Sequence, residues 1–176
     1  PPLAVSLAQH PRHPPRVPYP TPFRSVMGVI AFDVDGQAVD FSQTFSYRGI
    51  MNSGIPNMAM MFGYLRTSWT MRVDLVCDFV CRLLNHMDSS AATSCTPSLR
   101  PEDADMPAGP WVTLDQFNPA YMQRGLHLMP RAGDREPWRY SMDYYTEKDE
   151  LPAVDLTESA LVYATEPASI AQSKQA

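Results

Sequence analysis

The amino-acid sequence predicts an α/β fold in which β-strands precede one long helix, with irregular chain at both ends. Three observations predict this fold. Residues 26–41 are rich in β-forming side chains around the turn signal Asp35-Gly36. Residues 58–62 are apolar at every position, and residues 69–87 carry apolar side chains at steps of three and four. The 176-residue chain, 44% hydrophobic, is long enough to bury one core.

Composition argues against several classes of function. The net charge is −5 and no run of Lys or Arg occurs, which disfavours nucleic acid or acidic membranes as main partners. No apolar run reaches the roughly 20 residues of a membrane span. Three cysteines, an odd number, favour reduced thiols over a disulfide framework. We therefore expect a cytoplasmic protein without a membrane span.

The 18 prolines divide the chain into four predicted segments. Residues 1–25 form a Pro-rich arm that we expect to be disordered, because proline removes backbone donors and fixes φ; a Pro-rich docking ligand is the alternative. Residues 26–89 hold the strands and the long helix. Residues 90–150 form an irregular extension with short helices, and residues 151–176 form a flexible tail.

The predicted strands come first along the chain. Residues 26–32 and 38–41 form a hairpin around Asp35-Gly36. Residues 44–47 start a short strand that runs toward Met51, and residues 52–57 are a cluster of turn formers. Residues 58–62 suit a central strand of a covered, largely parallel sheet, since such strands are apolar on both faces.

The helical pattern predicts a helix over residues 69–87 that ends at residues 88–90. Ser68 is the expected N-cap, with a hydroxyl that accepts from the amide of Thr70 or Met71. The predicted core-facing stripe repeats at steps of four and three. Its members are Trp69, Val73, Val76, Val80, Leu83 and Met87.

The second half has weaker patterns. Residues 90–110 are loop-like, and residues 111–117 suit a short strand or extended segment. Residues 119–128 suit one or two helical turns. Residues 136–145 suit a short helix with Pro137 at its first position.

Candidate chemistry is sparse. Cys77 and Cys81 share a helical face near His86 and suggest a metal site, but no second ligand pair completes it, and a buried structural cysteine is the alternative. The sequence has no G-x-S-x-G and no G-x-G-x-x-G or P-loop fingerprint. We therefore assign neither a catalytic residue nor a metal ligand.

The start of the long helix is the remaining candidate site. Free amides of a first helical turn and the helix dipole favour an anion, and no Asp or Glu occurs among residues 68–73. The candidate binding residues are Thr67, Ser68, Trp69 and Thr70. A capped helix with no ligand is the alternative.

Residues 47–59, Phe62-Gly63-Tyr64, Ser68-Trp69-Thr70 and residues 74–87 resemble the C-terminal part of class B flavin monooxygenases. The resemblance extends from near Gly28 through residues 137–139 and is strongest to the Baeyer–Villiger and ethionamide-activating type. It implies an oxygenase that uses FAD and NADPH to insert oxygen into a ketone or heteroatom substrate. It also implies that Ser68, Trp69, Thr70 and their neighbour Thr67 lie at the pyrimidine edge of the flavin. The family often has Asn-Ala where this chain has Arg66-Thr67.

The dinucleotide fingerprints of that family are absent here, as is the signature between them. The resemblance therefore implies an incomplete C-terminal piece of a Rossmann-like FAD domain, a fragment that does not bind both cofactors or catalyse alone. Its expected partner is the missing FAD- and NADPH-binding region. A non-catalytic interaction module, or one half of a split flavoenzyme, remains the alternative, and whether the chain is itself an enzyme stays open.

Overall fold

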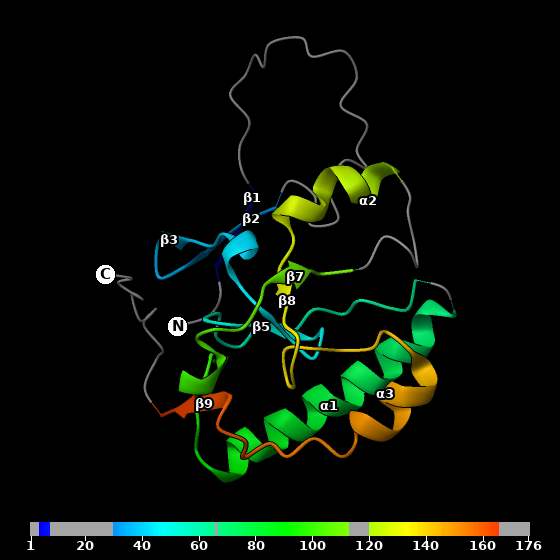
Figure 1. Ribbon diagram of the computed structural model, residues 1–176. Coiled ribbons are helices and arrows are strands. Elements are labelled where there is room, and N and C mark those ends of the chain that lie inside the picture. The colour runs from blue at the N-terminus through cyan, green and yellow to red at the C-terminus, as the bar shows by residue number, and fades with distance from the viewer. Residues whose placement is uncertain (1–3, 8–29, 66, 113–119, 166–176) are drawn as a thin grey trace.

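The computed structural model describes residues 4–7, 30–65, 67–112 and 120–165 (Figure 1). The longest described helix, α1 (Trp69–Ser89), lies beside α3 (Tyr144–Glu150), and short antiparallel strands lie on the other side of α1. None of the described helices is long and apolar enough to cross a membrane. The four-segment division of the chain stays a prediction, although β-strands occur in the segments that were expected to be disordered, irregular or flexible.

A three-stranded antiparallel sheet opens the fold in the order β1-β2-β3. It contains β1 (Ala4–Leu7), β2 (Ile30–Val34) and β3 (Gln37–Ala38). The predicted hairpin is confirmed, with Asp35 and Gly36 at positive φ in its turn. The hairpin is shorter than predicted because residues 41–43 turn into a 3-10 helix that Asp40 caps. β1 lies in the arm that was expected to be disordered, and residues 8–29 lie outside the described residues.

The next hairpin pairs β4 (Ser46–Tyr47) with β5 (Met51–Asn52). The short strand predicted to start at residues 44–47 is confirmed in part by β4, but it does not continue toward Met51, because the chain reverses at Arg48 and Gly49, which both have positive φ. The predicted turn cluster is confirmed at residues 53–54 and 56–57.

The central parallel strand predicted at residues 58–62 is wrong. These residues are irregular, Met61 is 45% exposed, and all named strand pairs among the described residues are antiparallel. The segment covers the β4-β5 hairpin instead, with the Met60 amide donating to the Ile50 carbonyl. Phe62, at the end of the segment, is buried although the segment forms no strand and pairs with no neighbouring strand. The small α/β architecture is thus observed, while a Rossmann-like sheet is not seen in the described part of the chain.

Helix α1 is confirmed, with Ser68 at its N-cap. Its buried face is rotated from the predicted one: Trp69 is 46% exposed, and Val73 and Val80 are only half-buried. The buried stripe consists of Arg72, Val76, Phe79, Leu83 and Met87. Arg72 takes a place in this stripe because a buried partner neutralises it, as described below.

The segments after α1 are more regular than predicted. In the part expected to be a loop, β6 (Ser94–Pro97) pairs antiparallel with β9 (Leu161–Ala164). A 3-10 helix covers Pro101–Asp103, and β7 (Gly109–Pro110) pairs with β8 (Arg131–Ala132). The tail expected to be flexible from residue 151 therefore contributes β9 and buries Leu151 and Val154 against α1 and its neighbours.

Two predicted short helices have different outcomes. The helical turns predicted at residues 119–128 are confirmed by α2 (Ala120–Gly125) and the 3-10 helix Leu126–Leu128. Of the extended segment predicted at residues 111–117, residues 113–117 lie outside the described residues. The helix predicted from Pro137 is wrong, because residues 136–138 form a turn that buries Trp138. The helix begins later, at α3, where Asp143 accepts from the Thr146 amide at 3.0 Å.

The main core lies between α1 and the strands. Tyr47 packs against Phe79 of α1 and against Trp138, with ring centroids 6.3 and 6.1 Å apart. A second cluster gathers Phe62, Trp111 and the side chains around α2. The start of α1 lies against this second cluster through the contact of Trp69 with Phe62.

Candidate functional site

The four residues predicted as the site lie together at the exposed start of α1. Thr67, Ser68, Trp69 and Thr70 are all solvent-exposed, and the first turn contains no acidic side chain. The Ser68 hydroxyl does not cap a backbone amide, contrary to the prediction, but lies 3.0 Å from the Thr70 hydroxyl. The first amides of a helix have no intrahelical acceptor, so this end presents donors and a positive dipole to solvent.

The loop before the helix is fitted closely to Trp69. The Phe62 ring meets the Trp69 indole edge-on at 4.8 Å and the Trp111 indole at 4.5 Å. A Cβ atom on Gly63 would lie 2.4 Å from the Trp69 ring and 2.5 Å from the Trp69 carbonyl oxygen. Position 63 therefore requires glycine, because the backbone there lies too close to Trp69 for a side chain. Residues 62–63 contact one side of the indole.

Beneath the exposed helix start lies a buried ion pair that sequence reasoning missed. Arg72 of α1 is fully buried, and its Nε donates to Oε2 of Glu147 in α3 at 2.8 Å. Glu147 also accepts from the Tyr64 hydroxyl at 2.8 Å. Burial, and next the Glu147 carboxylate, raises the pKa of Tyr64 above its ordinary value, so the phenol remains a donor. The only sequence signal was an arginine four residues before Val76 in an apolar stripe.

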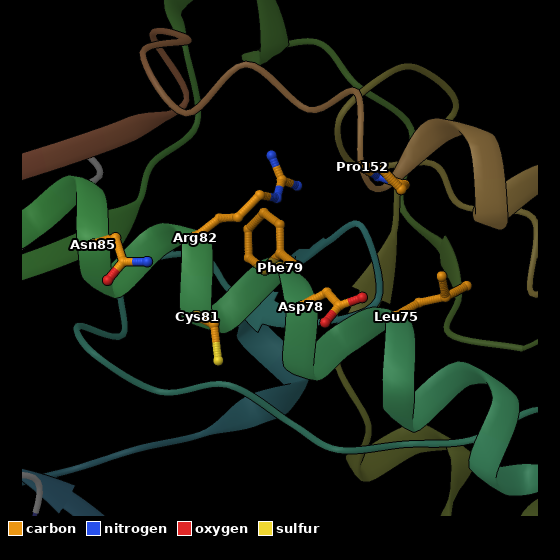
Figure 2. Close-up of a pocket in the computed structure, with 7 residues that line it drawn as sticks. All are labelled: Leu75, Asp78, Phe79, Cys81, Arg82, Asn85 and Pro152. Atoms are coloured by element: carbon orange, nitrogen blue, oxygen red, sulfur yellow. The ribbon is translucent and has the colours of Figure 1, made fainter.

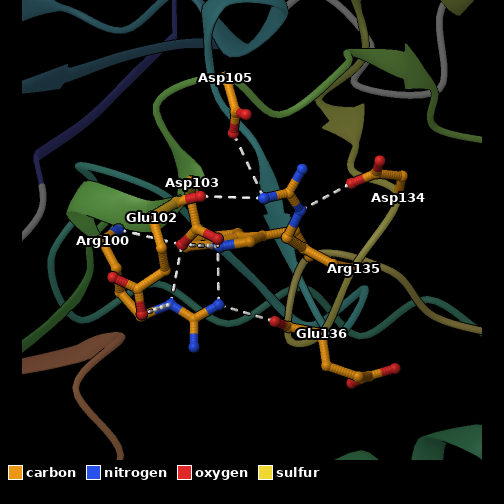
Figure 3. Close-up of polar contacts among 8 residues, drawn as sticks. Arg100, Glu102, Asp103, Asp105, Asp134, Arg135 and Glu136 are labelled. Carbon is orange, nitrogen blue, oxygen red and sulfur yellow. Dashed lines mark hydrogen bonds and ion pairs between the residues drawn. The ribbon is translucent and has the colours of Figure 1, made fainter.

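A second polar cluster surrounds Asp103, as Figure 3 shows. Asp103 is 2% exposed and accepts from Arg100 Nε and from the indole of the fully buried Trp138, both at 2.8 Å. The Arg100 guanidinium, with help from the Trp138 donor, lowers the pKa of Asp103 to about 2. The carboxylate accepts its hydrogen bonds from Arg100 and Trp138 of the protein itself. The cluster therefore links distant segments of the chain and is not arranged for proton transfer.

A shallow groove of about 290 Å³ runs along α1 away from its first turn (Figure 2). Apolar side chains of Leu75, Phe79 and Pro152 form much of its wall. The other lining residues are Asp78, Cys81, Arg82 and Asn85. Arg82 donates to the carbonyl oxygens of Leu151 and Val154, so this guanidinium holds the segment after α3 in place.

The cysteines are not gathered into a metal site among the described residues, where no three His, Cys, Asp or Glu side chains lie close enough to hold an ion. Cys77 and Cys81 are exposed on α1, and Cys95 is buried. The ring of His86 packs against Tyr163 with centroids 5.0 Å apart. Burial raises the pKa of Cys95 to about 11, so this thiol remains protonated.

The residues present fit one part of a flavin cofactor and not the whole. An anionic ring edge is matched by the exposed amides, the Ser68 and Thr70 hydroxyls and the absence of a carboxylate in the first turn. The diphosphate of a dinucleotide needs a glycine-rich turn between a strand and a helix, and this sequence has none. The helix start can therefore form one wall of such a site.

Comparison with known proteins gives a consistent relationship. The chain is 37% identical over 139 residues to the FAD-containing monooxygenase EthA of Mycolicibacterium smegmatis, covering 79% of this chain and 27% of that protein. It is 39% identical over 137 residues to EthA of Mycobacterium tuberculosis, covering 78% and 27%. It is 31% identical over 142 residues to a probable FAD-binding monooxygenase, AlmA, of an Acinetobacter species, again covering 78% and 27%.

The chain thus spans about a quarter of the length of the curated relatives that it matches. No family model matches the chain, and no solved structure gives a significant match.

Proposed function

We propose that this chain, which is similar to FAD-containing monooxygenases over about a quarter of their length, forms the C-terminal wall of their flavin site. The match to two differently named monooxygenases, EthA and AlmA, over about 78% of the chain carries the proposal. The complete cytoplasmic enzyme would belong to the Baeyer–Villiger type and would use FAD and NADPH to insert oxygen into a ketone or heteroatom substrate. The bound flavin would supply the oxidation chemistry.

The role of this chain's own residues would be to hold and polarise one edge of the ring. The amides of the first turn of α1 and the hydroxyls of Ser68 and Thr70 would donate to the pyrimidine side. Trp69, already packed on Phe62, would present its exposed indole face beside the cofactor. Preorganised donors of this kind stabilise negative charge without reorganising during the reaction.

The dinucleotide fingerprints that this sequence lacks would come from another region, either on the same polypeptide or on a partner chain. We therefore expect the chain alone to bind FAD weakly and not to oxidise NADPH. The test replaces the matched 139-residue segment of M. smegmatis EthA with the aligned part of this chain. A chimera that retains FAD through gel filtration supports the proposal, and one that folds without flavin overturns it. An isolated chain that purifies yellow and oxidises NADPH contradicts the incomplete-site part.

A second candidate, a non-catalytic interaction module, is favoured by the apolar side chains left exposed on α1. Trp69 is 46% exposed and Leu84 is 54% exposed. This candidate predicts that the folded chimera lacks FAD, while the chain itself purifies with a separate protein that contains a dinucleotide-binding fold.

Thr70→Asp separates the flavin-edge role from that of a simple capped helix. A carboxylate in the first turn interacts favourably with the helix dipole, so we expect the chain to gain about 0.3–1 kcal/mol in free energy of unfolding. The same charge would repel an anionic flavin edge, so FAD affinity of the chimera should fall about tenfold. Urea unfolding and FAD fluorescence titration measure the two effects.

The matched control is Asn85→Asp, which adds the same charge on an exposed site of α1 about 22 Å along the helix. It should leave FAD affinity unchanged. If Thr70→Asp stabilises the chain and, like Asn85→Asp, leaves FAD affinity unchanged, the helix start is only a capped helix.

A further inference from the structure

The buried pair Arg72–Glu147 lies one turn inside the helix start and connects segments that are far apart in sequence. Its side chains are 0% and 2% exposed. Two charges are removed from water only at a considerable desolvation cost, which excellent geometry and further hydrogen bonds must offset. Arg72 has such bonds, and each ends on a different piece of the chain.

The guanidinium holds three backbone carbonyls besides its carboxylate partner. Nη1 donates to the carbonyl oxygen of Phe62 at 2.8 Å and to that of Gly49 at 3.3 Å, and Nη2 donates to that of Arg48 at 3.1 Å. A Cβ atom on Gly49 would lie 2.7 Å from Nη2, so glycine leaves room for this approach. One side chain thereby ties the β4-β5 turn, the loop before α1 and α3 to the helix.

We propose that Arg72 and Glu147 are positioning residues that set the orientation of the Trp69–Thr70 turn toward the flavin edge. This inference rests on the proposed function. The mechanical link is the loop of residues 62–64: Arg72 holds the Phe62 carbonyl, and Glu147 holds the Tyr64 hydroxyl. Between these two anchors, Gly63 lies against the Trp69 indole, and the Phe62 ring packs on its edge. A shift of the loop therefore moves Trp69.

A purely stabilising pair makes a different prediction, and a double replacement separates the two. Arg72→Met with Glu147→Leu keeps similar volume without the charges, a change that is often neutral or stabilising for a buried pair. It removes the donors to Phe62, Gly49 and Arg48 and the acceptor for Tyr64. A pair that only stabilises would leave the helix start unaltered in any variant that folds with native circular dichroism.

The first readout is iodide quenching of tryptophan fluorescence in the full chain. Trp69 is 46% exposed, whereas Trp111 and Trp138 are 3% and 0% exposed, so a soluble quencher reports on Trp69. The double variant should raise the quenching constant by up to about twofold, because the loop no longer covers the indole. The matched control removes the exposed pair by Arg135→Met with Asp105→Leu, and its quenching should equal that of the unaltered chain.

The second readout is FAD affinity in the EthA chimera, which should fall about tenfold with the double variant and remain unchanged with the control. Tyr64→Phe removes one donor to Glu147 and keeps the ring. It should also raise the quenching constant and lower FAD affinity, each by less than the double variant does. This single variant provides the test if the double variant does not fold. If the unaltered chimera fails to bind FAD, the proposed function fails and the iodide readout alone decides positioning. Unchanged quenching in folded variants overturns the inference.

Discussion

Glu147→Gln is expected to lower the free energy of unfolding by about 3–5 kcal/mol, the largest effect expected of any single carboxylate among the described residues. The change leaves the fully buried Arg72 guanidinium without a counter-charge. An amide oxygen in the place of Oε2 can still accept from Tyr64 and from Arg72 Nε, but the amide nitrogen then takes the place of Oε1 and turns its donors toward Arg72 Nη2. A domain of this size has about 5–15 kcal/mol of stability in total, so the variant would be marginal at room temperature. Urea unfolding followed by circular dichroism measures the loss.

The control is Glu150→Gln on the same helix, where the side chain is exposed. It should change stability by no more than about 0.5 kcal/mol. A loss below about 1 kcal/mol for Glu147→Gln would mean that water reaches Arg72 in solution and that the pair is not sealed. The positioning role inferred for the pair would then lose its physical basis.

Local patterns were sufficient to predict α1 and its start. Apolar periodicity, Ser68 before it and the acid-free first turn are all short-range features, and the structure places Thr67–Thr70 together on an exposed helix end. The Asp35-Gly36 turn is equally local, since positive φ at both positions suits those two residues. These features depend on the chain within a few residues, so a sequence window contains their cause.

The failures have a different physical origin, because they depend on contacts between distant segments. The apolar run at residues 58–62 is compatible with a central strand and with an irregular segment that covers a hairpin. Only the presence or absence of neighbouring strands decides between these two structures. Arg72 and Glu147 are 75 positions apart, and no local pattern marks them as partners. The same holds for β6 and β9, whose pairing brings the segment after residue 151 into the core.

The second large effect is expected for Asp103→Ala, which should lower stability at neutral pH by about 3 kcal/mol. Asp103 receives the indole N–H of Trp138, which is 0% exposed, together with two guanidinium donors of Arg100. Alanine leaves the buried indole N–H without an acceptor, and that desolvation cost adds to the lost charge-assisted bonds. The control Asp105→Ala removes only an exposed partner of Arg135, 83% exposed, and should change stability by about 0.5 kcal/mol or less.

The pH dependence of stability identifies the part of the Asp103 contribution that comes from the ionised carboxylate. The folded pKa of Asp103 is about 2, below the ordinary value of 3.8, so its ionised form stabilises the fold above about pH 4. This contribution, about 2 kcal/mol, is lost progressively as the pH falls through that window toward 2. The stability difference between the unaltered chain and Asp103→Asn should therefore shrink over this range, while other acids cancel in the comparison. A difference independent of pH would show that Asp103 acts through shape and neutral hydrogen bonds alone, and that Arg100 does not depress its pKa.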